Sequence, residues 1–125
     1  MVDLSKLKKI NGHGHILPEP NQIPKFMKNK KLFWIDEDKK FMLQGDWSRP
    51  ITDPSFFLNE KIEWMQKNEI DHGVMLNLSQ VYCNGWNRQD AQDAIRWQND
   101  FNASVQNENS DLFTCGFVVQ PLFLT

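Results

Sequence analysis

The chain has 125 residues, a formal net charge of −2 and a hydrophobic fraction of 40%, with nine Phe and five Trp. This length and this apolar, aromatic content suit one folded domain and exclude an intrinsically disordered chain. Basic residues gather only in the lysine run from 25 to 31, which is typical of a solvated face, so we expect no nucleic-acid partner.

The sequence also argues against a membrane partner and against export. No stretch approaches the roughly 20 apolar residues of a membrane span, and the first ten residues lack the apolar core of a signal peptide. Cys83 and Cys115 lie far apart without a CxxC motif, which is typical of reduced cytosolic thiols rather than of a disulfide framework. We therefore expect a cytoplasmic location.

The first predicted element is a strand over about residues 8–16. A long connection follows at about 19–51, and connections of this length usually carry a function. It contains an apolar piece at 32–35, a turn at 36–38 and a second apolar piece at 39–43, which together predict a small inserted hairpin.

Two helices and two further strands are predicted after this insertion. Asp53 and Pro54 open the first helix, and the apolar spacing from 89 to 107 predicts the second. Nearly continuous apolar runs at 73–79 and 112–119 are typical of buried parallel strands. This alternation predicts an α/β fold with right-handed β-α-β units and a parallel sheet of about three strands. Because such a sheet leaves two edges unpaired, we expect the chain to be the opening part of a larger fold.

The most informative motif is Gly12-His13-Gly14-His15, near the end of the first strand. Side chains of a strand alternate between its faces, so two histidines two residues apart point the same way. Imidazole is the commonest metal-binding side chain near neutral pH, and the two glycines let other groups approach the strand closely. The pair predicts half of a divalent metal site, with Zn²⁺ as the first candidate. The alternative is two polar side chains that face solvent at a strand end.

The residues around this pair, Ile10-Asn11-Gly12-His13-Gly14-His15-Ile16-Leu17-Pro18, resemble the opening strand of the amidohydrolase superfamily. They look most like its amidohydrolase 2 branch, which includes aminocarboxymuconate-semialdehyde decarboxylase and commonly begins Ile-Asp-x-His-x-His. Further similarity lies in Asp53-Pro54 before a helix, in Asn99-Asp100 and in the run 113–117, so the resemblance spans most of the chain. Asn11 stands where the family usually has Asp.

The resemblance implies a (β/α)₈ TIM barrel in which the metal lies at the C-terminal ends of the strands. It implies that His13 and His15 are metal ligands and that the remaining ligands, typically a histidine and an aspartate on later strands, lie beyond Thr125. It also implies metal-dependent hydrolysis, or non-oxidative decarboxylation, of a small carboxylated or cyclic substrate. Because the ligand set is incomplete, we expect the isolated chain to have little or no activity.

Candidates for substrate binding lie in the loops and at the strand ends. Arg49 can pair with a carboxylate through its guanidinium, and Trp47 can line a pocket. Asn77 and Ser79 fall on one face of the second predicted strand near its C-terminal end, where barrel active sites form; hydrogen bonding within the barrel is the alternative. His72, at the other end of that strand, is interpreted as a turn residue. The next loop offers three further pocket-lining candidates, Tyr82, Asn84 and Trp86.

Two other hypotheses stay open. A non-catalytic chain would persist by pairing its exposed sheet edges with another copy or another chain, so that it forms a homo-oligomer or a complex. Alternatively, a small metal-binding module would assemble its site between two subunits, with His13 and His15 of each subunit giving four nitrogens.

Overall fold

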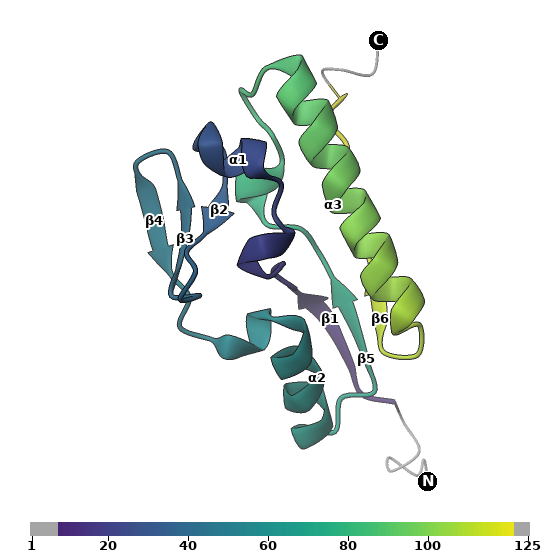
Figure 1. Cartoon of the computed structure of the whole chain (residues 1–125). Coiled ribbons are helices and arrows are strands. Elements are labelled where there is room, and N and C mark those ends of the chain that lie inside the picture. Colours follow the sequence, from purple (N-terminus) through teal and green to yellow (C-terminus); the bar gives the residue numbers. More distant parts are fainter. Residues whose placement is uncertain (1–7, 122–125) are drawn as a thin grey trace, which may run out of the picture.

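A computed structural model describes residues 8–121; residues 122–125 lie outside this range, as do residues 1–7, on which most of the argument against a signal peptide rests. Within the described range the chain forms one parallel and one antiparallel sheet, each of three strands, together with three α-helices (Figure 1). The predicted α/β class is therefore confirmed. None of the helices in this range is long and apolar enough to cross a membrane.

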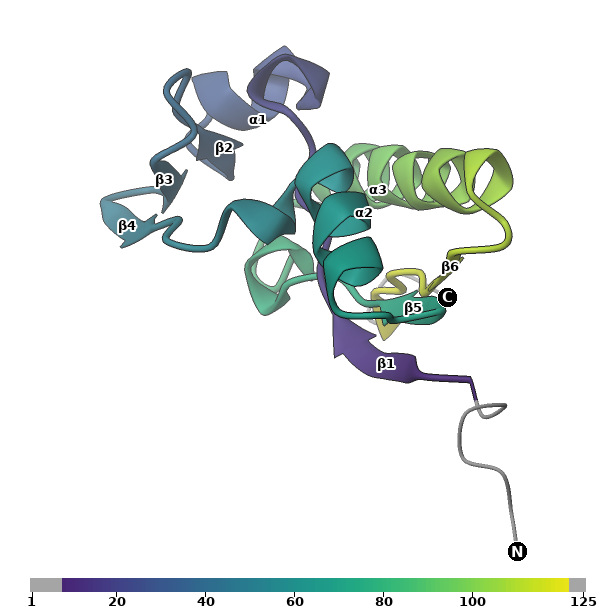
Figure 2. The same cartoon turned by 90° about the horizontal axis from the view of Figure 1, so that it is seen from below.

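The parallel sheet has the strand order β1-β5-β6, with β1 at Ile10–Gly14, β5 at His72–Met75 and β6 at Phe113–Cys115. Two helices make the crossovers. They are α2, at Leu58–Lys67, between β1 and β5, and α3, at Arg88–Glu108, between β5 and β6. Figure 2 shows both helices on the same face of the sheet. The opposite face has no helix over it in the described part of the chain.

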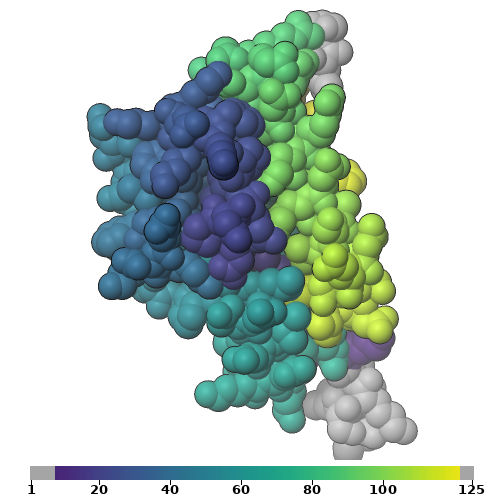
Figure 3. Space-filling view, viewed as in Figure 1, coloured from purple at the N-terminus to yellow at the C-terminus, as the bar shows by residue number. Residues whose placement is uncertain are grey.

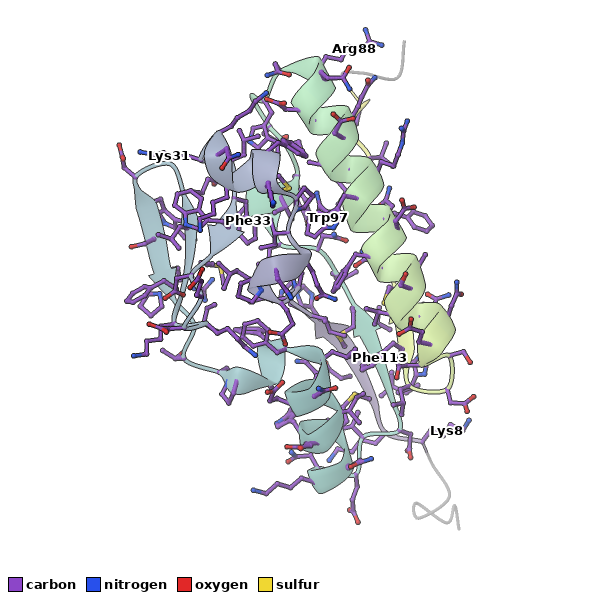
Figure 4. The ribbon with its side chains drawn as sticks, viewed as in Figure 1. Lys8, Lys31, Phe33, Arg88, Trp97 and Phe113 are labelled. Carbon is purple, nitrogen blue, oxygen red and sulfur yellow. The ribbon has the colours of Figure 1, made fainter. Side chains whose placement is uncertain are left out.

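One buried cluster joins this sheet to both helices. Met75 of β5 and Phe113 of β6 pack against Met65 of α2 and Val105 of α3, and each of the four is at most 5% exposed. Figure 4 labels Phe113 at this junction. The apolar stripes that predicted the two helices are confirmed, because their buried members face the sheet in this cluster.

Residues 19–51 form a small unit of their own. They hold α1, at Lys25–Asn29, and the antiparallel sheet β2-β3-β4, at Trp34–Ile35, Phe41–Gln44 and Trp47–Pro50. The predicted hairpin is confirmed as β2 and β3, whereas α1 and β4 are additional elements. Since all four side chains of β4 are exposed, its sequence has no apolar alternation that could indicate a strand.

A second buried cluster fixes this insertion to the rest of the molecule. Phe33 and Met42 of the insertion pack with Leu17, which follows β1, and with Ala91 and Ala94 on the first half of α3. The space-filling view shows the insertion, in blue, directly against α3, in green (Figure 3). The insertion is therefore part of the hydrophobic core and not a loose loop.

The predicted boundaries of several elements need correction. The Asp53 carboxylate accepts a hydrogen bond from the Ser55 N–H at 2.9 Å, but it caps a 3₁₀ turn at Pro54–Phe56, and α2 itself begins only at Leu58. The first strand spans five residues instead of nine, from Ile10 to Gly14.

The second and third parallel strands each end four residues before the predicted positions. Beyond β6, side chains of α3 take the backbone hydrogen bonds that a longer ladder would have used. Asn102 donates to the Gly116 carbonyl at 2.7 Å, and Asn99 exchanges two hydrogen bonds with the backbone of Val118. An apolar run in the sequence indicates that a segment is buried. It does not indicate which side chains of other elements will form hydrogen bonds with the backbone of that segment.

Candidate metal centre

A bulge in β1 sets the direction of the two histidines. Asn11 and Gly14 are three residues apart on β1, but their partners on β5 are only two residues apart. The strand β1 therefore contains one extra residue at this point. An extra residue exchanges the faces of everything that follows it. Gly14 therefore lies on the face covered by the helices, and His13 and His15 lie on the open face.

The two imidazole rings lie side by side at the C-terminal end of β1. Their centroids are 5.1 Å apart and their planes are nearly perpendicular, at 87°. His13 is exposed, while His15 is half-buried and also contacts the ring of Phe56. The predicted placement of both histidines on one side of the strand is confirmed, although His15 lies one residue past its end.

A backbone carbonyl orients His15. The Nδ1 atom of His15 lies 2.8 Å from the carbonyl oxygen of Leu76, just past the end of β5. Since a carbonyl can only accept, Nδ1 carries the proton and Nε2 keeps its lone pair. Metal-binding histidines are commonly oriented in this way, with the non-binding nitrogen donating to a backbone carbonyl. In the neutral imidazole of His15 this contact leaves Nε2 available as a metal ligand.

The spacing of the rings fits a shared metal ion. Zn–N bonds of about 2.0–2.1 Å at a tetrahedral angle place two imidazole centres about 5 Å apart, as observed for His13 and His15. A catalytic zinc usually has three protein ligands. Among residues 8–121, no group of three or more His, Cys, Asp or Glu side chains is placed to hold a metal ion. The pair therefore fits part of a metal site and not a whole one.

A hollow of about 220 Å³ lies past the C-terminal ends of β5 and β6, and neither His13 nor His15 lines it. Leu76, whose carbonyl holds His15, forms one wall, and Tyr82, Phe117 and Val119 form others. None of the described residues that line the hollow carries a charge. Such a surface suits an uncharged, apolar group of a ligand.

Arg49 and Trp47 lie elsewhere. Both are exposed on β4, the edge strand of the antiparallel sheet. Figure 1 and Figure 2 show β4 on the outer side of the insertion, away from β1. The structure does not bring these two predicted substrate-binding residues together with the histidine pair.

Asn77 lies past the end of β5 and not on a strand face, which corrects its predicted position. Its Nδ2 donates to the Gln98 side chain and its Oδ1 accepts from the Asn102 side chain, both at 2.9 Å. The amide is therefore engaged by α3, as in the alternative of hydrogen bonding within the fold. Ser79 is exposed at the start of a 3₁₀ turn, Ser79–Val81.

The loop after β5 contributes one of its three predicted pocket residues to the hollow. Tyr82 lines it, whereas exposed Asn84 accepts a hydrogen bond from Gln120, and Trp86 packs on the cluster around the insertion. Cys83, between them, is 1% exposed, and burial raises the pKa of its thiol to about 11. Because only the thiolate is a good nucleophile, Cys83 is inert at neutral pH.

His72 is the first residue of β5, which corrects its interpretation as a turn residue. Its Nε2 lies 2.8 Å from the Thr114 hydroxyl and its Nδ1 lies 3.2 Å from the Asp111 carbonyl oxygen. It pairs with Ile10 at the N-terminal end of the sheet, opposite to His13 and His15 as predicted. Both of its nitrogens have protein partners, so His72 ties β5 to β6.

Two parts of the centre could not be identified from sequence. The group that orients His15 is a backbone carbonyl 61 positions away, and a carbonyl gives no residue type to search for. The bulge has a weak local signal, because glycine inside a strand often marks one, and Gly12 and Gly14 flank His13.

Comparison with known proteins assigns no family to the chain. No family model matches it, and no curated protein matches it by sequence. The geometry of His13, His15 and Leu76 and the motif around them therefore remain the indications of function in this chain.

Proposed function

We propose that this chain carries the two-histidine strand of a metal-dependent hydrolase or non-oxidative decarboxylase of the amidohydrolase type, acting on a small carboxylated or cyclic substrate. The observation that carries the proposal is one arrangement: two adjacent imidazoles 5.1 Å apart, one of them oriented by the Leu76 carbonyl. It lies at the C-terminal end of a parallel strand, where the active sites of β/α barrels form.

The winding of the parallel sheet supports a barrel as the parent fold. The strands follow the order β1-β5-β6, and both crossover helices lie on one face. In a (β/α)₈ barrel, consecutive units add in one direction and the helices form an outer layer, whereas a doubly wound sheet reverses direction and has helices on both faces. We therefore propose that β1, β5 and β6 are the first strands of such a barrel, with residues 19–51 as an insertion.

The chemistry follows from which atoms face the open side of the sheet. A divalent ion such as Zn²⁺ supplies, when bound, a Lewis acid that polarises a substrate oxygen or acidifies a bound water. His15 would hold this ion through Nε2, because its Nδ1 donates to Leu76, and His13 would supply the second nitrogen. The neutral hollow at Tyr82 and Phe117 would receive the uncharged part of the substrate. Arg49, on β4, takes no part in this arrangement.

Isothermal titration of the full chain with zinc chloride near pH 7.5 tests the pair. We expect saturable binding that His13→Ala and His15→Ala each weaken by about tenfold or more, because each removes one nitrogen of the site. His72→Gln is the matched control and should bind zinc like the wild type, since His72 lies at the opposite end of β5. Zinc affinity that is unchanged in both alanine variants, or lost equally in the control, would contradict the proposal.

A second candidate function is self-association through the parallel sheet. The side chains of Ile10, Phe117 and Val119 are 58%, 77% and 57% exposed, and β1 and β6 are the edge strands of this sheet in the described chain. Apolar groups beside unpaired strand edges favour pairing with another chain. We propose a second copy as the partner, because the β6 edge of one copy and the β1 edge of another continue one parallel sheet. In this arrangement His13 and His15 of one copy would lie beside β6 of the other copy, so the two histidine pairs would not meet.

A further inference from the structure

Asn11 holds the bulge that directs the histidine pair. The Oδ1 atom of Asn11 accepts a hydrogen bond from the backbone N–H of His13 at 3.2 Å. An Asn side chain that bonds a backbone N–H two residues on closes a local turn. This turn coincides with the point where the register of β1 shifts against β5. The N–H of His13 is thus engaged by a side chain of its own strand.

The contacts of Gly14 also show which way the residues on either side of the bulge face. Gly14 is buried, and a Cβ built on it would lie 3.2 Å from the Nδ2 of Asn11 and 2.7 Å from the Cε of Met75. Asn11 and Gly14 therefore face the same side of β1, although they are three residues apart. Regular alternation would put residues three apart on opposite faces, so the extra residue lies between them.

We infer that Asn11 is a positioning residue for the metal pair: its side-chain oxygen stabilises the bulge that turns His13 and His15 to the open face of the sheet. The inference rests on the proposed metal site. If the strand were regular, a shift of one residue would turn both imidazoles toward the face covered by α2 and α3. The side-chain oxygen at position 11 would then determine whether the imidazole nitrogens of His13 and His15 face solvent or the hydrophobic core.

Two substitutions at position 11 distinguish the effect of the hydrogen-bond acceptor from the effect of side-chain shape. Asn11→Asp keeps an oxygen that can accept from the His13 N–H, whereas Asn11→Leu keeps the branched shape and the number of heavy atoms with no acceptor. The prediction uses zinc titration of the full chain, with ¹⁵N NMR of the imidazole nitrogens as a second readout. We expect N11L to bind zinc about tenfold more weakly or worse, as for other groups that orient metal ligands. N11D should stay within about threefold of the wild type.

The outcomes distinguish this inference from the function on which it rests. A wild-type chain that binds no zinc overturns the proposed metal site and the inference with it. A wild-type chain that binds zinc, beside an N11L variant of equal affinity, overturns the inference alone. A merely structural role for Asn11 would lower the melting temperature of N11L and leave the zinc affinity of its folded form unchanged. A zinc affinity of N11D as low as that of N11L would also overturn the inference. If N11L does not fold, Asn11→Ala takes its place in the comparison.

Discussion

At the scale of single residues, the glycines near the histidine pair differ in how much room each has. A Cβ on Gly14 or on Gly73 would lie 2.7 Å from the Cε of Met75. Among the described residues, no atom lies within 4 Å of a Cβ on Gly12 beyond its immediate chain neighbours. The Met75 side chain thus fills the space that two absent Cβ atoms leave on neighbouring strands.

We expect Gly14→Ala to lower the free energy of unfolding by about 1 kcal/mol, because the flexible end of the Met75 side chain must shift to admit the new methyl. Gly12→Ala is the matched control and should change it by less than about 0.5 kcal/mol. Urea denaturation measures both values. In a Met75→Ala background the cost of Gly14→Ala should shrink, because contacting residues are energetically coupled. An equal cost in both backgrounds would show that Met75 is not the cause.

At the scale of elements, α3 does more than cover the sheet. Its amide side chains hold the segments after β5 and β6, and its first turn holds the insertion. There, buried Asp90 accepts hydrogen bonds from the Lys30 ammonium at 2.8 Å and from the Asn87 side chain at 2.6 Å. The bond from Lys30, and to a smaller extent that from Asn87, keeps the pKa of the Asp90 carboxyl below its ordinary value of 3.8.

This lowered pKa predicts a loss of stability in acid. The ionised Asp90 contributes its full stabilisation well above its unfolded-state pKa of about 3.9, and the contribution is lost as the pH falls through the lower, folded-state pKa. We expect Asp90→Asn to lose less unfolding free energy between pH 6 and pH 3 than the wild type does, as measured by urea denaturation. Asp93→Asn, an exposed position in the same helix, should keep the wild-type loss. The prediction is wrong if Asp90→Asn loses as much as the wild type.

At the scale of the whole molecule, the helices of residues 8–121 cover one face of the parallel sheet and leave the other face open (Figure 2). The open face carries the histidine pair, and exposed apolar side chains lie along it and past its edge at Ile10 and Phe117. An α/β sheet is normally covered on both faces or closed into a barrel. Exposed apolar side chains beside the open face and the unpaired strand edges favour contact with another protein surface, and a second copy is the partner that we propose.

Sedimentation velocity tests the second copy. We expect the purified chain to associate at micromolar concentrations, and Phe117→Lys to return it to a monomer by placing a charge in the apolar contact. Phe41→Lys is the control, because Phe41 is 40% exposed on β3 of the insertion. A wild-type chain that stays monomeric over the whole concentration range would exclude self-association.

Much of the fold could be predicted because its signals are local. The apolar spacing of α2 and α3 indicates their buried faces directly, and the spacing of His13 and His15 places two imidazoles on one side of a strand. The positions of Arg49 and Trp47 in a long loop carried no comparable information, since a loop position does not show which part of the molecule the residue will meet.

The sequence by itself determined which segments become helices and buried strands, and which two side chains could share a metal ion. Only the tertiary structure decided which face of β1 those side chains take, what orients His15 and where Asn77 points. The reason is physical. Helix and strand periods arise within a few consecutive residues. The register of β1 against β5, the contact of His15 with the Leu76 carbonyl and the hydrogen bonds of α3 to Asn77 form only when distant segments pack together.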